Sequence, residues 1–199
     1  MAAPPEVTPR ARRRRADAQR SIEAIVEAAR TLLVERPEAS MDEIAAAAGV
    51  SRQTVYAHFS SRELLIAAVI NTQRAAQLAV LVDARLDRLP PVDAVRGFLD
   101  VGWRLVDRFP PLLDPVLART PDPDGDDPHR PVAVVLERII RRGQRSGDFD
   151  RTLPAGWLAA ATFGLGHTAV ELVARGELDR SRAASLLEVS VLRLYGTGR

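Results

Sequence analysis

The feature that most limits the possible folds of this chain is a pair of very short helical segments, in the sequence SMDEIAAAAGVSRQTVYAHF (residues 40–59). Ser40 and Glu43 have the S-x-x-E spacing of a capping box, which starts a helix. Gly49 favours the left-handed conformation and ends that helix after about two turns, and Ser51 can cap the next one. Helices this short are marginal alone, so both need tertiary support.

Apolar residues on both sides of this stretch can supply that support. Apolar positions at helical spacing predict a helix over residues 17–35. A second S-x-x-E box, Ser60 and Glu63, predicts a long helix to about Ala84. The two long helices and the two short ones together predict a helix-turn-helix. The side chains available for its core are Ile44, Ala47, Val50, Val55, Phe59 and Leu64.

The second short helix carries many different hydrogen-bonding groups. Base edges in the major groove of DNA require donors and acceptors, which Arg52, Gln53 and Thr54 provide near the helix N-terminus. Phosphates require neutral or cationic donors. The candidates for that role are Ser51, Tyr56, His58 and Arg62, with the amides that begin the following helix. An ordinary solvated helix face is the alternative interpretation.

Residues 40–70, SMDEIAAAAGVSRQTVYAHFSSRELLIAAVI, resemble the DNA-binding signature of the tetracycline-repressor-like (TetR) family of transcriptional regulators. The resemblance extends back to about residue 17. It implies that Tyr56 and Arg62 hold phosphates while residues 52–54 face the bases. It further implies an effector pocket in the C-terminal region and a dimer interface made largely from the last two helices. Gln53 stands where a small residue is common in the family, which bears on the choice of DNA sequence.

The rest of the chain predicts further helices at about 92–108, 111–119, 131–146, 154–174 and 180–195, and almost no strand signals. The fold class is therefore all-α. We expect an N-terminal three-helix helix-turn-helix DNA-binding domain and a C-terminal helical effector-binding and dimerisation domain. The expected boundaries are a disordered Arg-rich arm at 1–16, the DNA-binding domain at 17–62 and the second domain at 63–199.

Positive charge is concentrated near the N-terminus. Residues 10–20 contain six arginines and one aspartate, whereas the chain from Glu63 onward has 18 arginines and 18 acidic residues. Arginines in a disordered arm can enter a narrow minor groove. The candidates are Arg12, Arg13, Arg14 and Arg15. Non-specific attraction to phosphates and a solubilising tail are the alternatives.

The segment GWLAAATFGLGHTAVELVARG has apolar or small residues on almost every face, so a helix here must be buried nearly all round. The last helix has a similarly broad apolar face. We expect a homodimer through these two helices, because two recognition helices about 34–36 Å apart can occupy successive major grooves of a palindrome. Two core helices of a monomer are the alternative interpretation.

Aromatic, imidazole and leucine side chains at helical spacing are candidates for the effector pocket, with ordinary core packing as the alternative for each. They are Phe98, Trp103, Leu105, Phe109, Trp157, Phe163 and His167. His167 and Glu171 also have a spacing compatible with a metal ion, but no third ligand is evident, so we expect no metal site.

The composition excludes several other classes. The chain has no cysteine, which rules out disulfides, thiolate metal sites and cysteine nucleophiles. No apolar run approaches about 20 residues, so we expect no membrane span and a cytoplasmic location. We also expect no cofactor. We predict a sequence-specific transcriptional regulator, a repressor released from a palindromic operator by a small-molecule effector. An architectural or non-specific DNA-binding dimer is the alternative; an enzyme would need a nucleophile–base pair or metal cluster.

Overall fold

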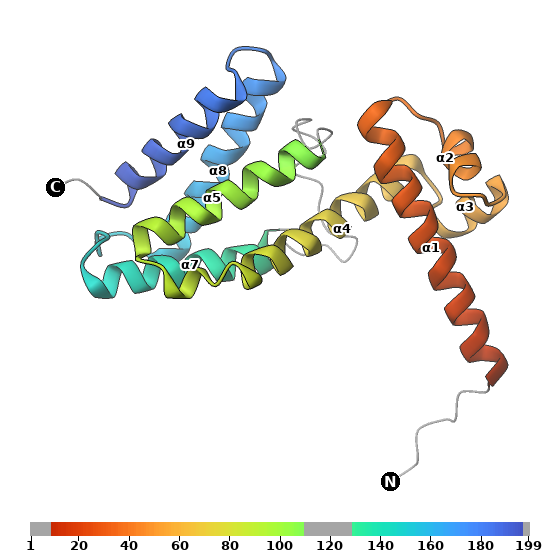
Figure 1. The fold of residues 1–199 in the computed structure, drawn as a ribbon, viewed down its shortest axis with the longest axis horizontal. Coiled ribbons are helices and arrows are strands. Elements are labelled where there is room, and N and C mark those ends of the chain that lie inside the picture. The colour runs from red at the N-terminus through yellow and green to blue at the C-terminus, as the bar shows by residue number, and fades with distance from the viewer. Residues whose placement is uncertain (1–8, 110–128, 197–199) are drawn as a thin grey trace, which may run out of the picture. The chain divides into compact units, whose positions relative to one another are not determined.

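The computed structural model describes residues 9–109 and 129–196, and every regular element in these ranges is a helix (Figure 1). This confirms the all-α class. The helix expected at 111–119 lies outside the described residues. Two compact units make up the chain, Met1–Val69 and Ile70–Arg199.

The first unit holds α1 (Pro9–Glu35), α2 (Met41–Ala47), α3 (Arg52–His58) and the beginning of α4 (Arg62–Asp83). α2 and α3 pack against α1 and against each other, so the short helices obtain the tertiary support that they need. The division between the units falls inside α4, and the domain boundary after residue 62 stays a prediction. Fully buried side chains come from all four helices: Ile25, Ala29, Ile44, Val55, Leu65 and Val69.

The start of α1 differs from the sequence expectation. The predicted disordered arm at 1–16 is helical from Pro9 onward, so residues 9–16 belong to α1. Arginine and alanine are among the best helix formers, and proline is favoured at the first helical position. The remaining part of the expected arm, residues 1–8, lies outside the described residues.

The caps predicted around α2 are present. The amide of Glu43 donates to Ser40 Oγ (3.3 Å), and the amide of Ser40 donates to Oε2 of Glu43 (2.8 Å). Gly49 has a φ of 67°, and its amide and the next one bond back to the carbonyls of Ala46 and Ala45. This is a Schellman motif, which satisfies the last carbonyls of α2 and turns the chain toward α3.

The start of α4 differs from the prediction by one residue. A capping box of Ser60 and Glu63 was expected, but the amide of Leu64 donates to Ser61 Oγ (3.3 Å), and α4 begins at Arg62. Two consecutive serines offer equivalent caps, so the sequence pattern alone could not distinguish between them.

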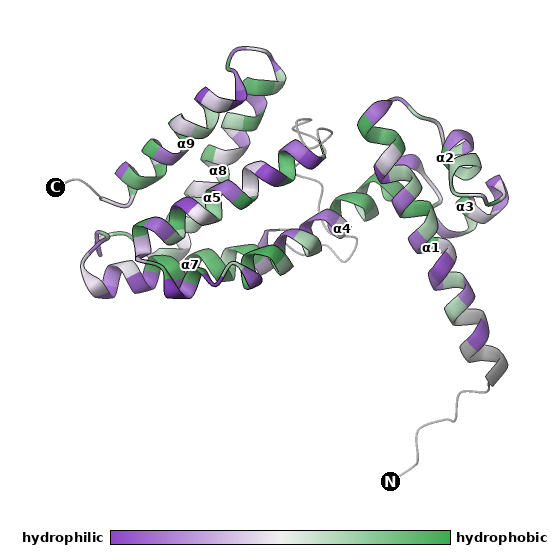
Figure 2. Ribbon diagram, viewed as in Figure 1, coloured by the Kyte–Doolittle hydropathy of each residue, from purple (hydrophilic) through white to green (hydrophobic). Residues whose placement is uncertain are grey.

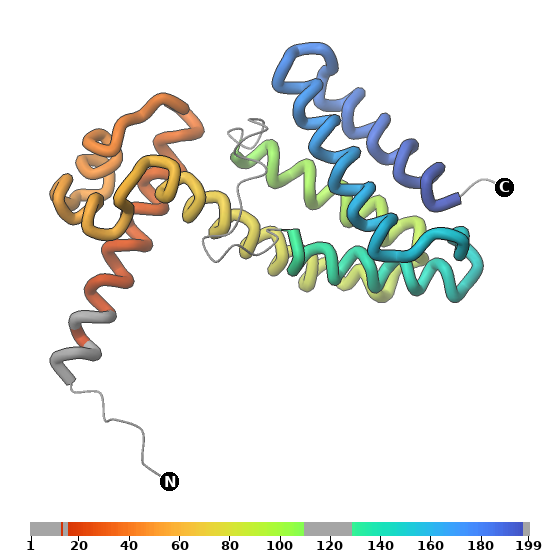
Figure 3. The backbone as a smooth tube through the Cα atoms, turned by 180° about the vertical axis from the view of Figure 1, so that it is seen from behind, coloured from red at the N-terminus to blue at the C-terminus, as the bar shows by residue number. Residues whose placement is uncertain are grey.

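The second unit holds the rest of α4 with η1 (Leu86–Arg88), α5 (Pro91–Arg108), α7 (Arg130–Ser146), α8 (Ala155–Ala174) and α9 (Arg180–Leu194). α5 and α8 each pack against both α7 and α9. Figures 1 and 3 show α8 and α9 side by side, running in opposite directions. Hydrophilic and hydrophobic residues alternate around α5 and α7 (Figure 2), as expected of helices that bury one face.

A buried pair of hydroxyl groups joins α8 to the end of α9. Tyr195 is fully buried, and its hydroxyl oxygen lies 2.7 Å from Oγ1 of Thr162. Thr162 in turn donates to the carbonyl oxygen of Leu158 (2.8 Å). Burial raises the pKa of the Tyr195 phenol well above its ordinary value, so the group remains neutral and the pair is uncharged.

Two helical stretches, Arg62–Arg88 and Ala155–Ala174, are long and apolar enough to cross a membrane by length and composition alone. No such segment was expected from the sequence. Core helices of soluble proteins share these properties, so the observation is weak evidence for a membrane span. In Ala155–Ala174 only 22% of the apolar window is buried, so α8 exposes surface that folded proteins normally cover.

Candidate nucleic-acid interface and ligand cavity

α3 buries one face and exposes the other. Val55 is fully buried, and Phe59, which ends the helix, is 8% exposed. These two side chains anchor α3 on the core of the first unit. The other side chains of interest are exposed (Arg52, Gln53, Tyr56) or half-buried (Thr54, His58). The outward face therefore carries the polar groups that the sequence assigned to DNA.

The guanidinium of Arg52 is oriented by its neighbours. Nη1 lies 2.7 Å from Oδ2 of Asp42 on α2, and the guanidinium carbon lies 5.2 Å from the centre of the Tyr56 ring. Both partners of the ion pair are exposed, so solvent screens it and it adds little to stability. Arg52 can therefore exchange Asp42 for an acceptor outside the protein at small cost.

Ser51 and Thr54 use their hydroxyl groups within α3. Ser51 Oγ accepts the amide of Thr54 (3.1 Å), which caps the helix, and it lies 2.8 Å from Oγ1 of Thr54. A hydroxyl has one hydrogen and two acceptor positions. Both side chains thus shape the start of α3, and any contact with DNA would use their remaining bonding capacity.

Arg62, suggested as a phosphate ligand, is bound within the first unit. Its guanidinium donates to the carbonyl oxygens of Pro37 and Ala39, the latter at 3.2 Å from Nε. These carbonyls lie between α1 and α2, so Arg62 ties that segment to the start of α4. A guanidinium has five N–H donors, and a phosphate contact is therefore compatible with this structural role.

The arginine run lies on a helix. Arg13 is exposed, and the side chains of Arg12, Arg14 and Arg15 lie outside the described residues. An α-helix is about 10–12 Å wide, whereas the minor groove of B-DNA is about 6 Å wide. This helical backbone is wider than the groove, so the run would have to unwind before it could lie there, and the minor-groove arm stays a prediction. Contacts with phosphates from outside the groove remain possible in this geometry.

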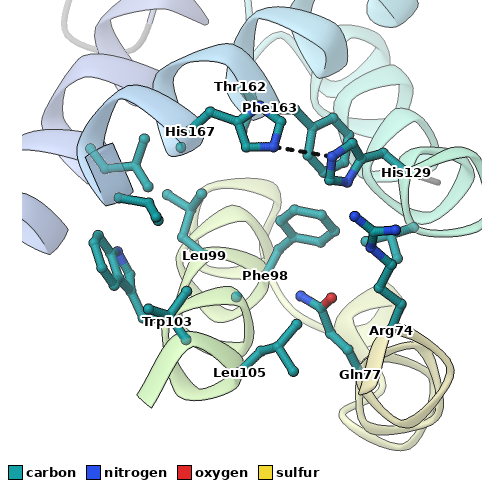
Figure 4. Close-up of a pocket in the computed structure, with 16 residues that line it drawn as sticks. Arg74, Gln77, Phe98, Leu99, Trp103, Leu105, His129, Thr162, Phe163 and His167 are labelled. Atoms are coloured by element: carbon teal, nitrogen blue, oxygen red, sulfur yellow. Dashed lines mark hydrogen bonds between the residues drawn. The ribbon is translucent and has the colours of Figure 1, made fainter. Parts of the chain in front are cut away.

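A cavity of about 150 Å³ lies within the second unit, between α4, α5, α7 and α8 (Figure 4). Several side chains suggested as pocket residues line it: Phe98, Trp103, Leu105, Phe163 and His167. The rings of Phe98 and Phe163 meet edge to face, with their centres 6.3 Å apart. The wall therefore combines aromatic and aliphatic side chains, and the binding of an effector there stays a prediction.

Phe109 and Trp157 were also expected in the pocket, but the structure places them elsewhere. Phe109 is fully buried and does not line the cavity, while Trp157 is 63% exposed on α8. Trp157 precedes the lining residue Phe163 by six positions, which is about 240° around the helix axis. It therefore points away from the cavity.

Polar groups from distant parts of the chain also line the cavity. His129 precedes α7, and its Nε2 lies 3.1 Å from Nε2 of His167 on α8. The ring of His129 stacks on Phe163 at 4.7 Å. Arg74 and Gln77, one turn apart on α4, reach into the cavity from the side opposite α8 (Figure 4).

Among the described residues, the imidazole pair has no further side chains around it that would make a metal cluster. Within residues 9–109 and 129–196 no three His, Asp or Glu side chains come together as a metal site would require. Glu171, at metal-compatible spacing from His167, lies instead 3.6 Å from Arg175. Two neutral imidazoles at 3.1 Å can form a hydrogen bond in which one donates and the other accepts.

Residues 25–69, from the middle of α1 into α4, match the sequence model of bacterial regulatory proteins of the tetR family. The chain belongs to the tetR family. It is thus a DNA-binding transcriptional regulator, and the family is not one of enzymes. No curated protein sequence matches the chain.

Solved structures share the fold of this tetR-family chain at low sequence identity. RolR in complex with resorcinol is 19% identical with a TM-score of 0.69, covering 92% of this chain and 90% of that one. FadR from Bacillus subtilis in complex with stearoyl-CoA is 16% identical with a TM-score of 0.67, and the match covers 89% of this chain and 98% of that one. LfrR from Mycobacterium smegmatis in complex with proflavine is 23% identical with a TM-score of 0.58, and the match covers 88% of this chain and 96% of that one. These likenesses extend the tetR-like fold across both units.

Three polar residues of the cavity in this tetR-family protein were missed by sequence analysis: Arg74, Gln77 and His129. His129 lies 38 residues before its partner His167, and no local pattern connects them. An available signal was the largely polar stretch at residues 71–77 of α4, in which Arg74 and Gln77 are about one turn apart between two apolar segments.

Proposed function

We propose that this protein is a homodimeric repressor that binds a palindromic operator in the cytoplasm and leaves it when a small molecule occupies the cavity. The observation that carries the proposal is the exposed polar face of α3 on a helix-turn-helix unit that matches the tetR family. Arg52, Gln53 and Thr54 contact base edges in the major groove. The groups that hold the phosphates are Ser51, Tyr56, His58 and Arg62.

A second copy of the chain would cover the exposed surface of α8 and α9. Trp157 is 63% exposed, and Leu186 and Val189 on α9 are 39% and 45% exposed. Gly164 on α8 has open space where a Cβ would lie, so a partner helix could approach closely there. An interface through these helices would bury the apolar surface and hold two α3 helices at a fixed spacing.

The size of the cavity limits the effector. A closed apolar cavity of about 150 Å³ can hold a benzene-sized molecule, and the volume here is about 150 Å³. Among the structural neighbours, RolR is bound to resorcinol, which has a single ring, whereas one FadR is bound to stearoyl-CoA. A single-ring molecule suits this cavity.

Coupling between effector and DNA would run through α4. Arg74 and Gln77 on this helix line the cavity. At its beginning, Arg62 donates to the carbonyls of Pro37 and Ala39 in the first unit. A ligand that favours one position of α4 would shift the population toward one spacing of the recognition helices.

Selection of bound duplexes from a random DNA pool, followed by fluorescence anisotropy at two salt concentrations, tests the proposal. A pseudo-palindrome bound at least about 10³-fold more tightly than scrambled DNA is the expected result. Equal binding of all duplexes, fading steeply with salt, would favour a non-specific architectural protein instead. The exposed Arg13 on the N-terminal part of α1 is the observation that favours this second candidate.

A further inference from the structure

The connection between α4 and α5 is held by one side chain from α7. The guanidinium of Arg142 donates to three backbone carbonyl oxygens of this connection, those of Leu86 (3.0 Å), Asp87 and Leu89 (2.6 Å). They belong to η1 and to the residue that follows it (Figure 1). Nε of Arg142 is buried and has no partner among the described residues. The guanidinium therefore binds the segment that ends α4 and leaves one donor unused.

Arg85, the residue before η1, has a backbone conformation that is unfavourable for its type. Its φ of 47° and ψ of 45° lie in the left-handed region, and no other described residue except glycine has a positive φ. A left-handed residue commonly ends an α-helix, but glycine usually occupies that position, because a side chain costs free energy there. The end of α4 at this point therefore depends on stabilising contacts elsewhere.

Two contacts provide that stabilisation. Leu86 is 5% exposed and packs closely on α5, where a Cβ on Gly97 would lie 2.9 Å from its side chain. Arg142 provides the second contact, because its bonds hold the carbonyls that follow Arg85. A residue in an unfavourable conformation persists only where the surrounding structure fixes it. The left-handed Arg85 is thus linked to a guanidinium 57 residues later in the chain.

The same segment has a second conformation open to it. If Arg85 adopted right-handed helical angles, α4 would continue through Leu86–Arg88, which already form the short helix η1. Pro90 would prevent a longer extension, because helical backbone is disfavoured at the residue before a proline. The extension would withdraw the carbonyls from Arg142 and remove Leu86 from its buried position. α4 therefore has two alternative ends, about one turn apart.

We propose that Arg142 is a positioning residue that fixes the end of α4, and that loss of its bonds lets the helix lengthen by about one turn. α4 is shared by the two units, and Arg74 and Gln77 in its middle line the cavity. A helix whose far end is fixed transmits a movement to its other end, whereas a helix with a free end absorbs it. Arg142 thus influences DNA binding without lining the cavity, and this second part rests on the proposed function.

Thermal unfolding of the purified full chain tests the helix end. Arg85→Gly should raise the unfolding temperature by about 2–4 °C, because glycine adopts positive φ without steric cost. In the Arg142→Gln protein residue 85 becomes helical, so the same glycine substitution should lower the unfolding temperature instead. Arg138→Gln removes an exposed arginine one turn earlier on α7 and is the control background, in which Arg85→Gly should still stabilise. Equal stabilisation by Arg85→Gly in the Arg142→Gln and Arg138→Gln backgrounds would overturn the proposal.

Backbone ¹³C chemical shifts of residue 85 give a readout that a general loss of stability does not change. In Arg142→Gln they should move to right-handed helical values, and in Arg138→Gln they should stay as in the unaltered protein. Arg142→Lys keeps the charge but lacks the planar fork of donors, so it serves as a second variant if Arg142→Gln folds poorly, and it should show the same movement. Left-handed values at residue 85 in the folded Arg142 variants would contradict the proposal.

The consequence for DNA is measured separately, by anisotropy with the selected operator. Arg142→Gln should weaken operator binding at least about threefold, because a smaller fraction of the molecules has the competent spacing of recognition helices, and Arg138→Gln should not. Unchanged operator affinity in Arg142→Gln would overturn the influence on DNA binding. If the unaltered protein selects no operator, the proposed function fails, while unfolding and chemical shifts still decide whether Arg142 fixes the end of α4.

Discussion

At the scale of single residues, Gln53 offers the cleanest test of sequence recognition. Arg52 already has Asp42 and Tyr56 as neighbours, and Thr54 bonds to Ser51, whereas Gln53 is exposed on the outer face of α3. Gln53→Ala should weaken binding to the selected operator about tenfold, because a good side chain–base contact is worth about 1–3 kcal/mol.

Anisotropy titration against the operator and its single-base-pair variants measures this effect. The preference at one base pair in each half-site should disappear, while binding to unrelated DNA changes by less than about twofold. Gln73→Ala on α4 is the control variant. A uniform loss of affinity for all duplexes would show that Gln53 does not contact a base.

The buried hydroxyl pair of Thr162 and Tyr195 makes a second prediction at this scale. Thr162→Val would leave the Tyr195 hydroxyl buried without a partner and lower the unfolding free energy by about 1–3 kcal/mol. Tyr195→Phe should cost about 1 kcal/mol, and the double variant less than the sum of the two.

Urea unfolding of the unaltered protein, the two single variants and the double variant measures these unfolding free energies. Thr168→Val is the control, because exposed Thr168 makes the same bond to a carbonyl four residues earlier (3.0 Å), and its removal should change stability by less than about 0.5 kcal/mol. If the losses of unfolding free energy in the two single variants add up to the loss in the double variant, the two hydroxyl groups do not interact.

Sequence patterns predicted residue roles well where the partners are close in the chain. The cap by Ser51 and the outward face of α3 follow from spacing over four or five residues. The bonds from Arg62 to carbonyls 23 and 25 residues earlier, and the contact of His129 with His167, depend on tertiary packing. Periodicity has no information about such distant partners, so these roles became apparent only in the structure.

At the scale of helices, the capping box of α2 predicts a pH effect. Hydrogen bonds from the amide and then the hydroxyl of Ser40 lower the pKa of Glu43, with a smaller effect from Arg36. The carboxylate therefore stabilises the cap above its unfolded pKa, near 4.5. That stabilisation is lost as pH falls through the lower folded pKa.

Hydrogen exchange of the α2 amides in the protein and in Glu43→Gln is the measurement. The variant should exchange faster at pH 6, and the difference should shrink at acidic pH, where the carboxyl group becomes protonated. Glu38→Gln, which alters an exposed carboxylate beside the cap, should show no such difference. A difference in amide exchange rate between the protein and Glu43→Gln that is unchanged down to pH 3 would contradict this role of the Glu43 carboxylate.

Helix positions were largely predictable, and the exceptions have physical reasons. α5 at 91–108 and α9 at 180–194 differ by one residue from the predicted 92–108 and 180–195, because prolines and caps mark their ends. The early start of α1 was missed because arginine has a high helix propensity but contributes no apolar periodicity. Periodicity detects helices that bury one apolar face, and the sequence of residues 9–16 has no apolar periodicity.

At the scale of the whole molecule, the sequence indicated a buried α8 but not what buries it. Within one chain, Leu158, Ala159 and Thr162 face the core, while Trp157 remains exposed. A strongly apolar helix with an uncovered side is expected where another chain packs. The identity of that chain depends on surface complementarity between two folded molecules, which no pattern in a single sequence describes.

The dimer prediction follows from this uncovered side. Val189→Glu and Trp157→Glu would each place a charge in the proposed interface, where desolvation costs several kcal/mol. The dissociation constant of the dimer should therefore rise at least about 100-fold. Val82→Glu is the matched control, because Val82 on α4 is 64% exposed, as Trp157 is at 63%, but lies outside α8 and α9.

Sedimentation velocity of the three variants and the unaltered protein distinguishes the outcomes, and circular dichroism establishes that each variant is folded. The unaltered protein and Val82→Glu should sediment as dimers, with the other two as monomers at micromolar concentration. Monomers should also lose most of their affinity for the full palindrome, since a single α3 contacts only one half-site. If Val82→Glu alone dissociates the dimer, the interface lies on α4 and the assignment to α8 and α9 is wrong.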